Sequence, residues 1–398
     1  MKDIVILAHY CGTLDGNHNS RFLELATLLS AAHSVEVITT DFMHATKRHI
    51  TAPAAEYPFK ITLLHEKGYP KNVCLQRFAS HHEFGKNVEQ YLNARKKPDV
   101  IYCAIPSLTA PLAAAEYCRE NGIRFVIDVQ DLWPEAFRMV FHVPVISDLV
   151  FAPMVHMVNR IYAAADAICA VSETYAKRAL SVNHKCTEGH SVYLGTRLAN
   201  FDRLRQAEPK LIKKPGERWI GYIGTLGHSY DLTSVLDALV FLRRERGISN
   251  VRFIVMGDGP LRAQFENYAN ALKLTVTFTG MLSYAEMVPF LCACDIAANP
   301  ITHGAAQSII NKVGDYAAAG LPVVNTQECP EYRDLVTDYD IGIHCKNGDV
   351  PALADAIEML LSDGAMRQRM GQNNRRLAEE RFDRATSYQT LLREILED

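Results

Sequence analysis

The sequence lacks long hydrophobic runs and any strong excess of charge of one sign. No apolar run of about 18 residues occurs anywhere in its 398 residues, so no membrane-spanning helix is predicted. The apolar segment 4–8 is too short for a signal peptide, and we expect it to form a first strand. With 42 Lys and Arg against 45 Asp and Glu, the formal net charge is -3. So small a charge argues against a nucleic-acid-binding protein.

Paired cysteines and internal repeats are also lacking. The ten cysteines are scattered, and the closest pair, Cys292 and Cys294, has the spacing neither of a zinc knuckle nor of a redox dithiol. We therefore expect buried thiols in a protein of the reducing cytoplasm. The sequence has neither a repeat of 20 to 50 residues nor a low-complexity tract, so neither a solenoid nor a disordered tail is predicted.

The basic residues are spread unevenly along the chain. Residues 1–205 carry 22 Lys and Arg against 20 Asp and Glu, whereas the remainder carries 20 against 25. Twelve of the 15 histidines also lie in the first part. This imbalance favours the first part as the one that approaches an anionic membrane surface.

The length and the hydrophobic pattern predict an α/β protein of two domains. A chain of 398 residues exceeds the size of a single growing core. Short runs rich in Val and Ile alternate with segments of helical period, a pattern typical of parallel sheets covered on both faces. We predict domains at 1–205 and 218–380, a polar linker at 206–217, and a last helix at 381–398 that packs back towards the first domain.

Three loops combine a preceding strand with glycines and a following helix. The loop 11–19 contains Gly12 and Gly16, and it suits either a phosphate site or a plain turn equally well. Gly224 and Gly257 each follow a predicted strand of the second domain. None of these loops has the dinucleotide pattern with its ribose-binding acid, so a nicotinamide-dependent dehydrogenase is not supported.

The segment 304–324 is the most informative. It predicts a short helix whose first amides face a diphosphate, with Lys312 as a mobile cation beside them and an end at Gly320. Gln307 and Asp315 are about two helical turns apart, so both are expected to face one ligand. The alternative is that Lys312 and Asp315 are ordinary solvated helix residues.

A series of motifs in the second half resembles a known family. The motifs are Gly224-Thr-Leu-Gly227, Val255-Met-Gly-Asp-Gly-Pro-Leu261, Phe278-Thr-Gly280 and Asn311-Lys312-x-x-Asp315-Tyr-Ala-Ala-Ala-Gly320. As a set they are similar to the donor domain of retaining glycosyltransferases of the GT-B fold, family 4, and the likeness covers nearly all of 218–398. The first half is less similar, although its run 131–135, Asp-Leu-Trp-Pro-Glu, resembles bacterial enzymes that build O-antigen, capsule and exopolysaccharide units.

The resemblance implies two Rossmann-like domains that face each other across a cleft, and a set of site residues. Catalytic roles fall to Asp131, Lys312 and Gln307; the last replaces an acid of the family motif and carries no charge. The implied donor-binding residues are Gly12, Gly16, Gly224, Gly257, Gly280, Met281, Ser308, Ile309, Ile310, Asn311 and Asp315.

The implied reaction is the transfer of a hexose from a UDP- or GDP-linked donor to a hydroxyl, with retention of configuration. No cofactor and no bound metal are expected. The acceptor is expected to be a saccharide or a polyprenyl-linked saccharide at the cytoplasmic face of the membrane. An apolar helical stripe from Leu149 to Tyr162 either lies on lipid or, as we favour, faces the core.

Two other functions remain open at this point. A sugar-nucleotide 2-epimerase has the same architecture and the same donor cleft, but the motifs of the segment 311–324 and of 131–135 are those of transferases. A non-catalytic subunit that binds a nucleotide sugar is the second alternative, because Gln307 lacks the charge of the usual acid.

Overall fold

The chain forms two compact units, which we describe one at a time. The structure is a computed structural model, and it describes residues 1–14, 20–72, 74–140, 146–305 and 308–397. The first unit comprises Met1–Val192 and Tyr388–Asp398, and the second comprises Tyr193–Ser387. The chain therefore returns to the first unit at its end.

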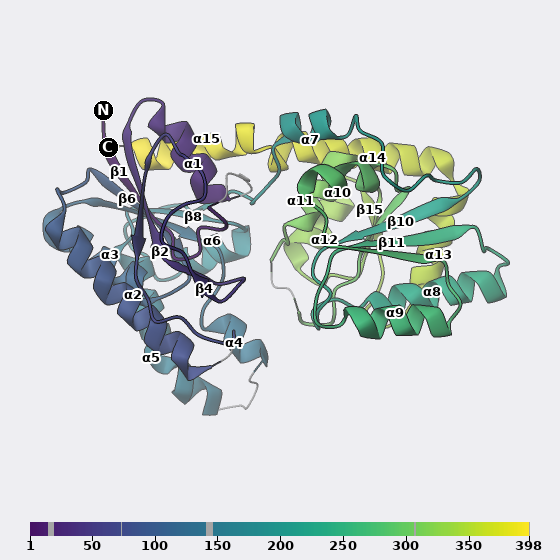
Figure 1. Ribbon diagram of the computed structural model, residues 1–398, viewed down its shortest axis with the longest axis horizontal. Coiled ribbons are helices and arrows are strands. Elements are labelled where there is room, and N and C mark those ends of the chain that lie inside the picture. The colour runs from purple at the N-terminus through teal and green to yellow at the C-terminus, as the bar shows by residue number, and fades with distance from the viewer. Residues whose placement is uncertain (15–19, 73, 141–145, 306–307, 398) are drawn as a thin grey trace. The chain divides into compact units, whose positions relative to one another are not determined.

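The first unit is built on a seven-stranded parallel sheet (Figure 1). Its strand order is β5-β2-β1-β6-β7-β8-β9. The strands are β1 (Asp3–Leu7), β2 (Ser34–Thr40), β5 (Lys60–Leu64), β6 (Val100–Ile105), β7 (Arg124–Val129), β8 (Ala167–Ala170) and β9 (His190–Ser191). A small antiparallel hairpin, β3 (Phe42–Met43) and β4 (Arg48–His49), follows β2.

Helices cover this sheet because the strands bury side chains on both faces. The helices are α1 (Arg21–Ser30), α2 (Leu75–Ala94), α3 (Thr109–Asn121), α4 (Glu135–Val140), α5 (Ile146–Ala164), α6 (Glu173–Leu180) and the end of α15 (Arg384–Leu396). Ile4 and Ile6 of β1 share one core cluster with residues of α1 and with Leu391 and Ile395 of α15. The C-terminal helix thus completes the core of the first unit.

A buried ion pair fixes α1 against the sheet. The Arg21 Nε lies 2.8 Å from Asp128 Oδ2, and both side chains are almost fully buried. Arg21 also donates to the carbonyl of Val192 at 2.7 Å. One side chain therefore ties the helix after the glycine loop to β7 and to the end of the first unit's main segment.

The second unit contains a six-stranded parallel sheet in the order β12-β11-β10-β13-β14-β15. The strands are β10 (Arg218–Ile223), β11 (Val251–Met256), β12 (Val276–Gly280), β13 (Ile296–Asn299), β14 (Val323–Asn325) and β15 (Gly342–His344). The helices are α7 (Leu198–Leu204), α8 (Leu232–Glu245), α9 (Arg262–Ala271), α10 (Tyr284–Cys292), α11 (Lys312–Ala319), α12 (Pro330–Asp338), α13 (Val350–Ser362), α14 (Gly364–Leu377) and the π-helical turn η1 (Ala378–Phe382). The predicted α/β fold with two parallel sheets is confirmed.

The second unit begins before the polar segment at 206–217. Leu198 and Phe201 of α7 are buried in the core cluster that contains Trp219 of β10. Arg375 of α14 holds the same helix through Asp202, with both Nη–Oδ distances at 2.7 Å. Apolar packing therefore joins α7 to the second unit, ahead of the polar composition that suggested a linker.

The apolar stripe on α5 is divided between the core and the solvent. Val158, Ile161 and Tyr162 are buried, whereas Leu149 is 80% and Val150 is 62% exposed. The expectation that the stripe faces the core thus holds for its later turns and fails for its first turn. Within the described residues, no helix combines the length and the apolar character that crossing a membrane requires.

Candidate functional site

In the second unit, the predicted glycine turns lie at the carboxyl ends of the central strands. The strand order reverses at β10, which pairs with β11 on one side and with β13 on the other, and such a switch point is where open α/β sheets bind ligands. The Gly224 amide donates to the Met256 carbonyl at 3.0 Å. A Cβ at Gly257 would lie 1.8 Å from the Gly224 oxygen. The two turns therefore pack backbone to backbone, which only glycine permits at Gly257.

Lys312 lies at the first position of α11, and its ammonium group is buried beneath the Gly224 turn. Its Nζ is 3.9 Å from the ring centroid of Tyr222 and 4.0 Å from that of Tyr230. A Cβ at Gly224 would lie 3.2 Å from this nitrogen. The residue is 7% exposed, and its Nζ has no hydrogen-bond partner among the described residues.

Burial lowers the pKa of Lys312 well below its usual value, because the charged form loses its hydration. The burial of Lys312 between two rings contradicts both the expected mobility of this cation and the alternative of a solvated helix residue. The two tyrosine rings surround the ammonium and fix its position at the switch point. An anion that enters beside the Gly224 turn would favour the charged form of Lys312 and pair with it.

The segment that precedes α11 is not helical, which corrects the predicted geometry. The helix begins at Lys312, and residues 308–311 form turn and irregular structure. The predicted helix therefore does not extend through residues 308–311 ahead of Lys312. Gln307, like Gly16 of the first unit, lies outside the described residues. The predicted start of this helix was wrong because sequence periodicity locates the first residue of a helix poorly.

Asp315 is engaged by two hydroxyl groups of its own unit. Its Oδ1 accepts from Thr196 Oγ1 at 2.9 Å and from the Tyr284 hydroxyl at 2.8 Å. Burial raises the pKa of this carboxyl, and both hydrogen bonds act against that rise. Asp315 therefore ties α11 to the segment that leads into the second unit, in addition to any contact with a ligand.

The predicted donor residues Ser308 to Asn311 are anchored by a buried amide network. The Ser308 carbonyl accepts from Gln327 Nε2 at 2.7 Å, and the Asn299 amide donates to Gln327 Oε1 at 3.1 Å. Asn299 also donates to Asn325 Oδ1 at 2.7 Å. Ser308 and Ile309 are buried, Ile310 is half-buried and Asn311 is exposed. Sequence reasoning missed the three amide side chains, although two of them directly end the buried strands β13 and β14.

The remaining predicted donor residues lie at the end of β12. Gly280 has a left-handed φ of 75°, and a Cβ there would lie 3.0 Å from Arg262 Nη1. The side chain of Met281 is 77% exposed. The structure thus brings Gly224, Gly257 and Lys312 together, and it leaves Met281 in the solvent at a neighbouring strand end.

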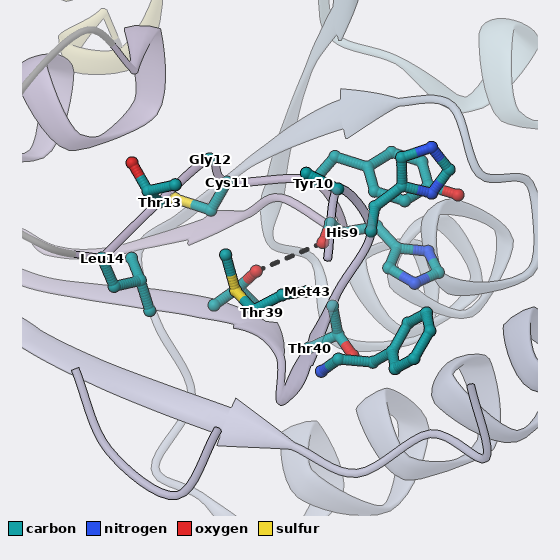
Figure 2. Close-up of a pocket in the computed structure, with 12 residues that line it drawn as sticks. His9, Tyr10, Cys11, Gly12, Thr13, Leu14, Thr39, Thr40 and Met43 are labelled. Carbon is teal, nitrogen blue, oxygen red and sulfur yellow. Dashed lines mark hydrogen bonds between the residues drawn. The ribbon is translucent and has the colours of Figure 1, made fainter. Parts of the chain in front are cut away.

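In the first unit, a pocket of about 280 Å³ opens at the carboxyl ends of β1 and β2. Figure 2 shows the loop after β1 on one side of it and the end of β2 with the following segment on the other. The lining includes the predicted Gly12, together with His9, Tyr10, Cys11, Thr13, Leu14, Thr39, Thr40, Phe42, Met43, His44 and Ala45. The Thr39 hydroxyl donates to the His9 carbonyl at 3.3 Å and joins the two strand ends (Figure 2).

His9 is the centre of a buried polar network beneath this pocket. Its Nε2 lies 2.9 Å from Glu66 Oε1, and its Nδ1 lies 2.7 Å from the Ser107 hydroxyl. Glu66 also accepts from Thr40 at 2.8 Å and from Ser80 at 2.5 Å. Both imidazole nitrogens are therefore engaged, and His9 supports the loop after β1 instead of presenting a free base.

Asp131 follows β7, as predicted, but its oxygens are both occupied. Oδ1 accepts from the Leu132 amide at 2.9 Å, and Oδ2 accepts from Trp133 Nε1 at 3.2 Å. Burial raises the pKa of the carboxyl, which these bonds partly oppose. Asp131 therefore caps the turn after β7 and keeps a half-buried carboxylate at the strand end.

Comparisons with known proteins relate the second unit to one enzyme family. Residues 217–363 match the model of the family described as Glycosyl transferases group 1. The alpha-D-kanosaminyltransferase of Streptomyces kanamyceticus is 27% identical over 154 residues, which are 38% of this chain. The match spans only 38% of that relative's own length.

Solved structures extend the likeness to the whole chain at the level of the fold. The structure of Anabaena HepE in complex with UDP has a TM-score of 0.67 at 18% identity over 98% of both chains. WaaG, a glycosyltransferase involved in lipopolysaccharide biosynthesis, has a TM-score of 0.69 at 16% identity over 99% of this chain and 100% of its own. The predicted GT-B fold is thereby confirmed, and 217–363 is the part whose sequence is similar to group 1 glycosyltransferases.

Proposed function

We propose that this protein is a retaining hexosyltransferase of the group 1 type that takes its sugar from a nucleotide-sugar donor. The donor is UDP-linked or GDP-linked, and the acceptor is a saccharide or a polyprenyl-linked saccharide. The observation that carries the proposal is the buried, unpartnered ammonium of Lys312 beneath the Gly224 turn. In this proposal the enzyme works in bacterial surface polysaccharide biosynthesis, in the cytoplasm or at the cytoplasmic face of the membrane.

A buried ammonium without a partner is costly, so its persistence at a switch point calls for an anionic ligand. The effective penalty for burying one ion is several kcal/mol, and an opposite charge with good geometry offsets it. The first turn of α11 adds the positive end of a helix dipole at the same place. A diphosphate that binds here pairs with Lys312 and with backbone amides of the Gly224 turn.

The same contacts favour the transfer reaction. When the bond between the sugar's anomeric carbon and the diphosphate oxygen breaks, the electron pair stays on the diphosphate. The acceptor hydroxyl oxygen forms the new bond to that carbon and gives up its proton to the leaving diphosphate. Lys312 stabilises the charge that grows on the leaving group, which lowers the barrier more than it strengthens binding of the donor.

The comparisons support the finer parts of the proposal to different degrees. The HepE structure contains UDP, which favours a UDP-linked donor over donors with other bases for this chain. The role of WaaG in lipopolysaccharide biosynthesis favours a surface saccharide as acceptor. Retention rests on the resemblance of the motifs at 311–320 to retaining enzymes of family 4. A 2-epimerase is disfavoured because the family match over 217–363 is to transferases.

A thermal-shift screen tests the donor site. Purified protein is heated with UDP, GDP, CDP, TDP and their common sugar conjugates, because a ligand of the native state raises the melting temperature. We expect a shift with one diphosphate that is lost in Lys312→Met and kept in Lys346→Met, an exposed lysine of the same unit. No shift with any nucleotide at millimolar concentration would overturn the donor site. Conversion of the nucleotide sugar without an acceptor would instead identify an epimerase.

A further inference from the structure

A pair of cations without a carboxylate partner lies beside the pocket of the first unit. Lys47 Nζ is 4.7 Å and Arg77 Cζ is 5.5 Å from the ring centroid of Tyr69, so both cations contact the same ring. Lys47 comes from the β3–β4 hairpin, and Arg77 comes from the first turn of α2. In the described part of the chain, neither cation forms a salt bridge with Asp or Glu, and the side-chain hydrogen bonds of both go to neutral groups.

Neutral groups hold the Arg77 guanidinium in place. Nη1 donates to the Asn72 carbonyl at 2.9 Å, and Nη2 donates to the Tyr10 hydroxyl at 2.9 Å. Its Cζ lies 4.8 Å from the ring centroid of Trp133. Nε is buried and has no hydrogen-bond partner among the residues that the structure describes. A fixed guanidinium with an unused donor is suited to bind an oxyanion.

Lys47 is oriented towards the same place by uncharged partners. Its Nζ donates to Asn72 Oδ1 at 2.6 Å and lies 3.4 Å from His44 Nδ1. His44 lines the pocket and bonds to the Tyr69 hydroxyl at 2.5 Å. The two cations are therefore connected to the pocket wall through His44 and Tyr10, both of which line it.

Among the described residues, the neighbouring titratable groups form no salt bridge with these two cations. Burial, and then nearby cations, lower the pKa of His44 to about 4 and that of His81 to about 2, so both rings are uncharged at neutral pH. The buried carboxylate of Glu66 is occupied by the His9 network described above. Asp131 lies close enough to Arg77 for the guanidinium to oppose the burial that raises the pKa of this carboxyl, but it forms no salt bridge among the described residues, and its oxygens accept from Leu132 and Trp133.

We propose that Arg77 and Lys47 form an acceptor subsite that binds a phosphate or diphosphate group beside the pocket of the first unit. The inference rests on the proposed function, because it describes the acceptor of that transfer. A phosphate offers several oxygens in a tetrahedral arrangement, which suits a guanidinium fork and a separate ammonium from another element. A planar carboxylate is bound fully by the guanidinium fork alone and needs no second cation.

Calorimetric titration of the full-length protein with inorganic pyrophosphate tests the subsite. Saturating UDP is present so that the donor site is occupied, and the Lys312→Met variant repeats the titration if UDP does not bind. We expect Arg77→Gln and Lys47→Gln each to weaken pyrophosphate binding about tenfold or more, the value of a charge-assisted hydrogen bond. Arg119→Gln, an exposed arginine of α3, is the matched control and is expected to bind as the unmodified protein does.

Two sources of the phosphate are separated by the choice of probe. Tighter binding of geranyl diphosphate than of glucose 1-phosphate supports a lipid-linked acceptor, and the reverse supports a free sugar phosphate. Binding of glucuronate as tight as that of pyrophosphate would overturn the phosphate assignment. Equal pyrophosphate affinity in Arg77→Gln, Lys47→Gln and the control would overturn the subsite itself.

The outcome is independent of the donor site and of misfolding. UDP affinity is expected to be unchanged in Arg77→Gln. Failure of UDP to bind any variant would refute the proposed function. The pyrophosphate titration of Lys312→Met would still test the subsite in that case. Lys47→Gln alters a different element, so it preserves the test if Arg77→Gln does not fold. Once a donor and an acceptor are found, Arg77→Gln and Lys47→Gln are each expected to raise the KM for the acceptor and to leave kcat unchanged.

Discussion

Replacing Lys312 with methionine is predicted to stabilise the fold and to weaken nucleotide binding at the same time. Methionine keeps an unbranched apolar chain among the tyrosine rings and removes the buried charge. The two ring contacts stabilise a desolvated ammonium by about 0.5–2 kcal/mol each. The effective cost of burying an unpaired ion is several kcal/mol, and burial accordingly lowers the pKa of Lys312.

The net gain in the free energy of unfolding is about 1–3 kcal/mol at neutral pH. For a unit of this size the melting temperature rises by about 2–4 °C per kcal/mol, which gives a rise of about 2–12 °C. UDP affinity is expected to fall by about tenfold to a hundredfold, because a hydrogen bond to a charged group is worth about 1.5–3 kcal/mol. Both quantities come from one thermal-shift series with and without UDP.

The pH dependence of stability gives a second readout for Lys312. The folded-state pKa lies below the usual 10.5, so the folded protein binds fewer protons than the unfolded chain between those two values. Stability from this group therefore rises as the pH increases from the lowered pKa to 10.5, and the methionine variant loses that slope. A lower melting temperature together with unchanged UDP affinity in Lys312→Met would refute the reasoning, and Lys346→Met controls for loss of a lysine.

Three further substitutions test other parts of the account by urea unfolding. Gly257→Ala is expected to cost at least about 2 kcal/mol because its Cβ would meet a backbone oxygen at 1.8 Å. Gly247→Ala is the control, because a Cβ there meets nothing within 4 Å and costs only the αL strain of about 1–2 kcal/mol. Asp315→Ala is expected to cost about 1–3 kcal/mol by leaving two hydroxyl donors unpaired, and Asp315→Asn, which keeps an acceptor, to cost less; equal losses would contradict this. Arg21→Met is expected to cost about 3–5 kcal/mol by leaving Asp128 buried and unpaired, and a loss below about 1 kcal/mol would be inconsistent with the ion pair.

The sequence was sufficient for the fold and for the positions of the glycine turns. Buried parallel strands read as apolar runs, and the glycines that follow β10 and β11 stand directly after those runs. The close approach of Gly257 to the Gly224 carbonyl is a local consequence of neighbouring parallel strands. Such features depend on short segments and on register, so pattern reasoning recovers them.

The burial of Lys312 was beyond sequence reasoning because its partners are distant along the chain. Tyr222 and Tyr230 precede it by more than 80 positions, and only the sheet order brings their rings to its ammonium group. The place of α7 in the second unit was missed for a similar reason. Phe201 is held by tertiary packing on the second core, which composition around 206–217 does not reveal.

The polar groups of the first unit were indicated only as a statistical excess of histidine. His9 and His81 are 72 positions apart, His81 lies in α2 and Glu66 follows β5, so no motif spacing unites them. Arg77 stood in the sequence as an ordinary charge in a helical segment. Its meaning follows from Tyr69 and Trp133, whose rings contact it in the folded unit.

A crystal structure of the protein with bound UDP tests the central claim most directly. The account predicts that the diphosphate lies beside the Gly224 turn with a phosphate oxygen about 3 Å from Lys312 Nζ. Density for UDP at another place, or a diphosphate that leaves Lys312 unpaired between Tyr222 and Tyr230, would contradict the proposed donor site.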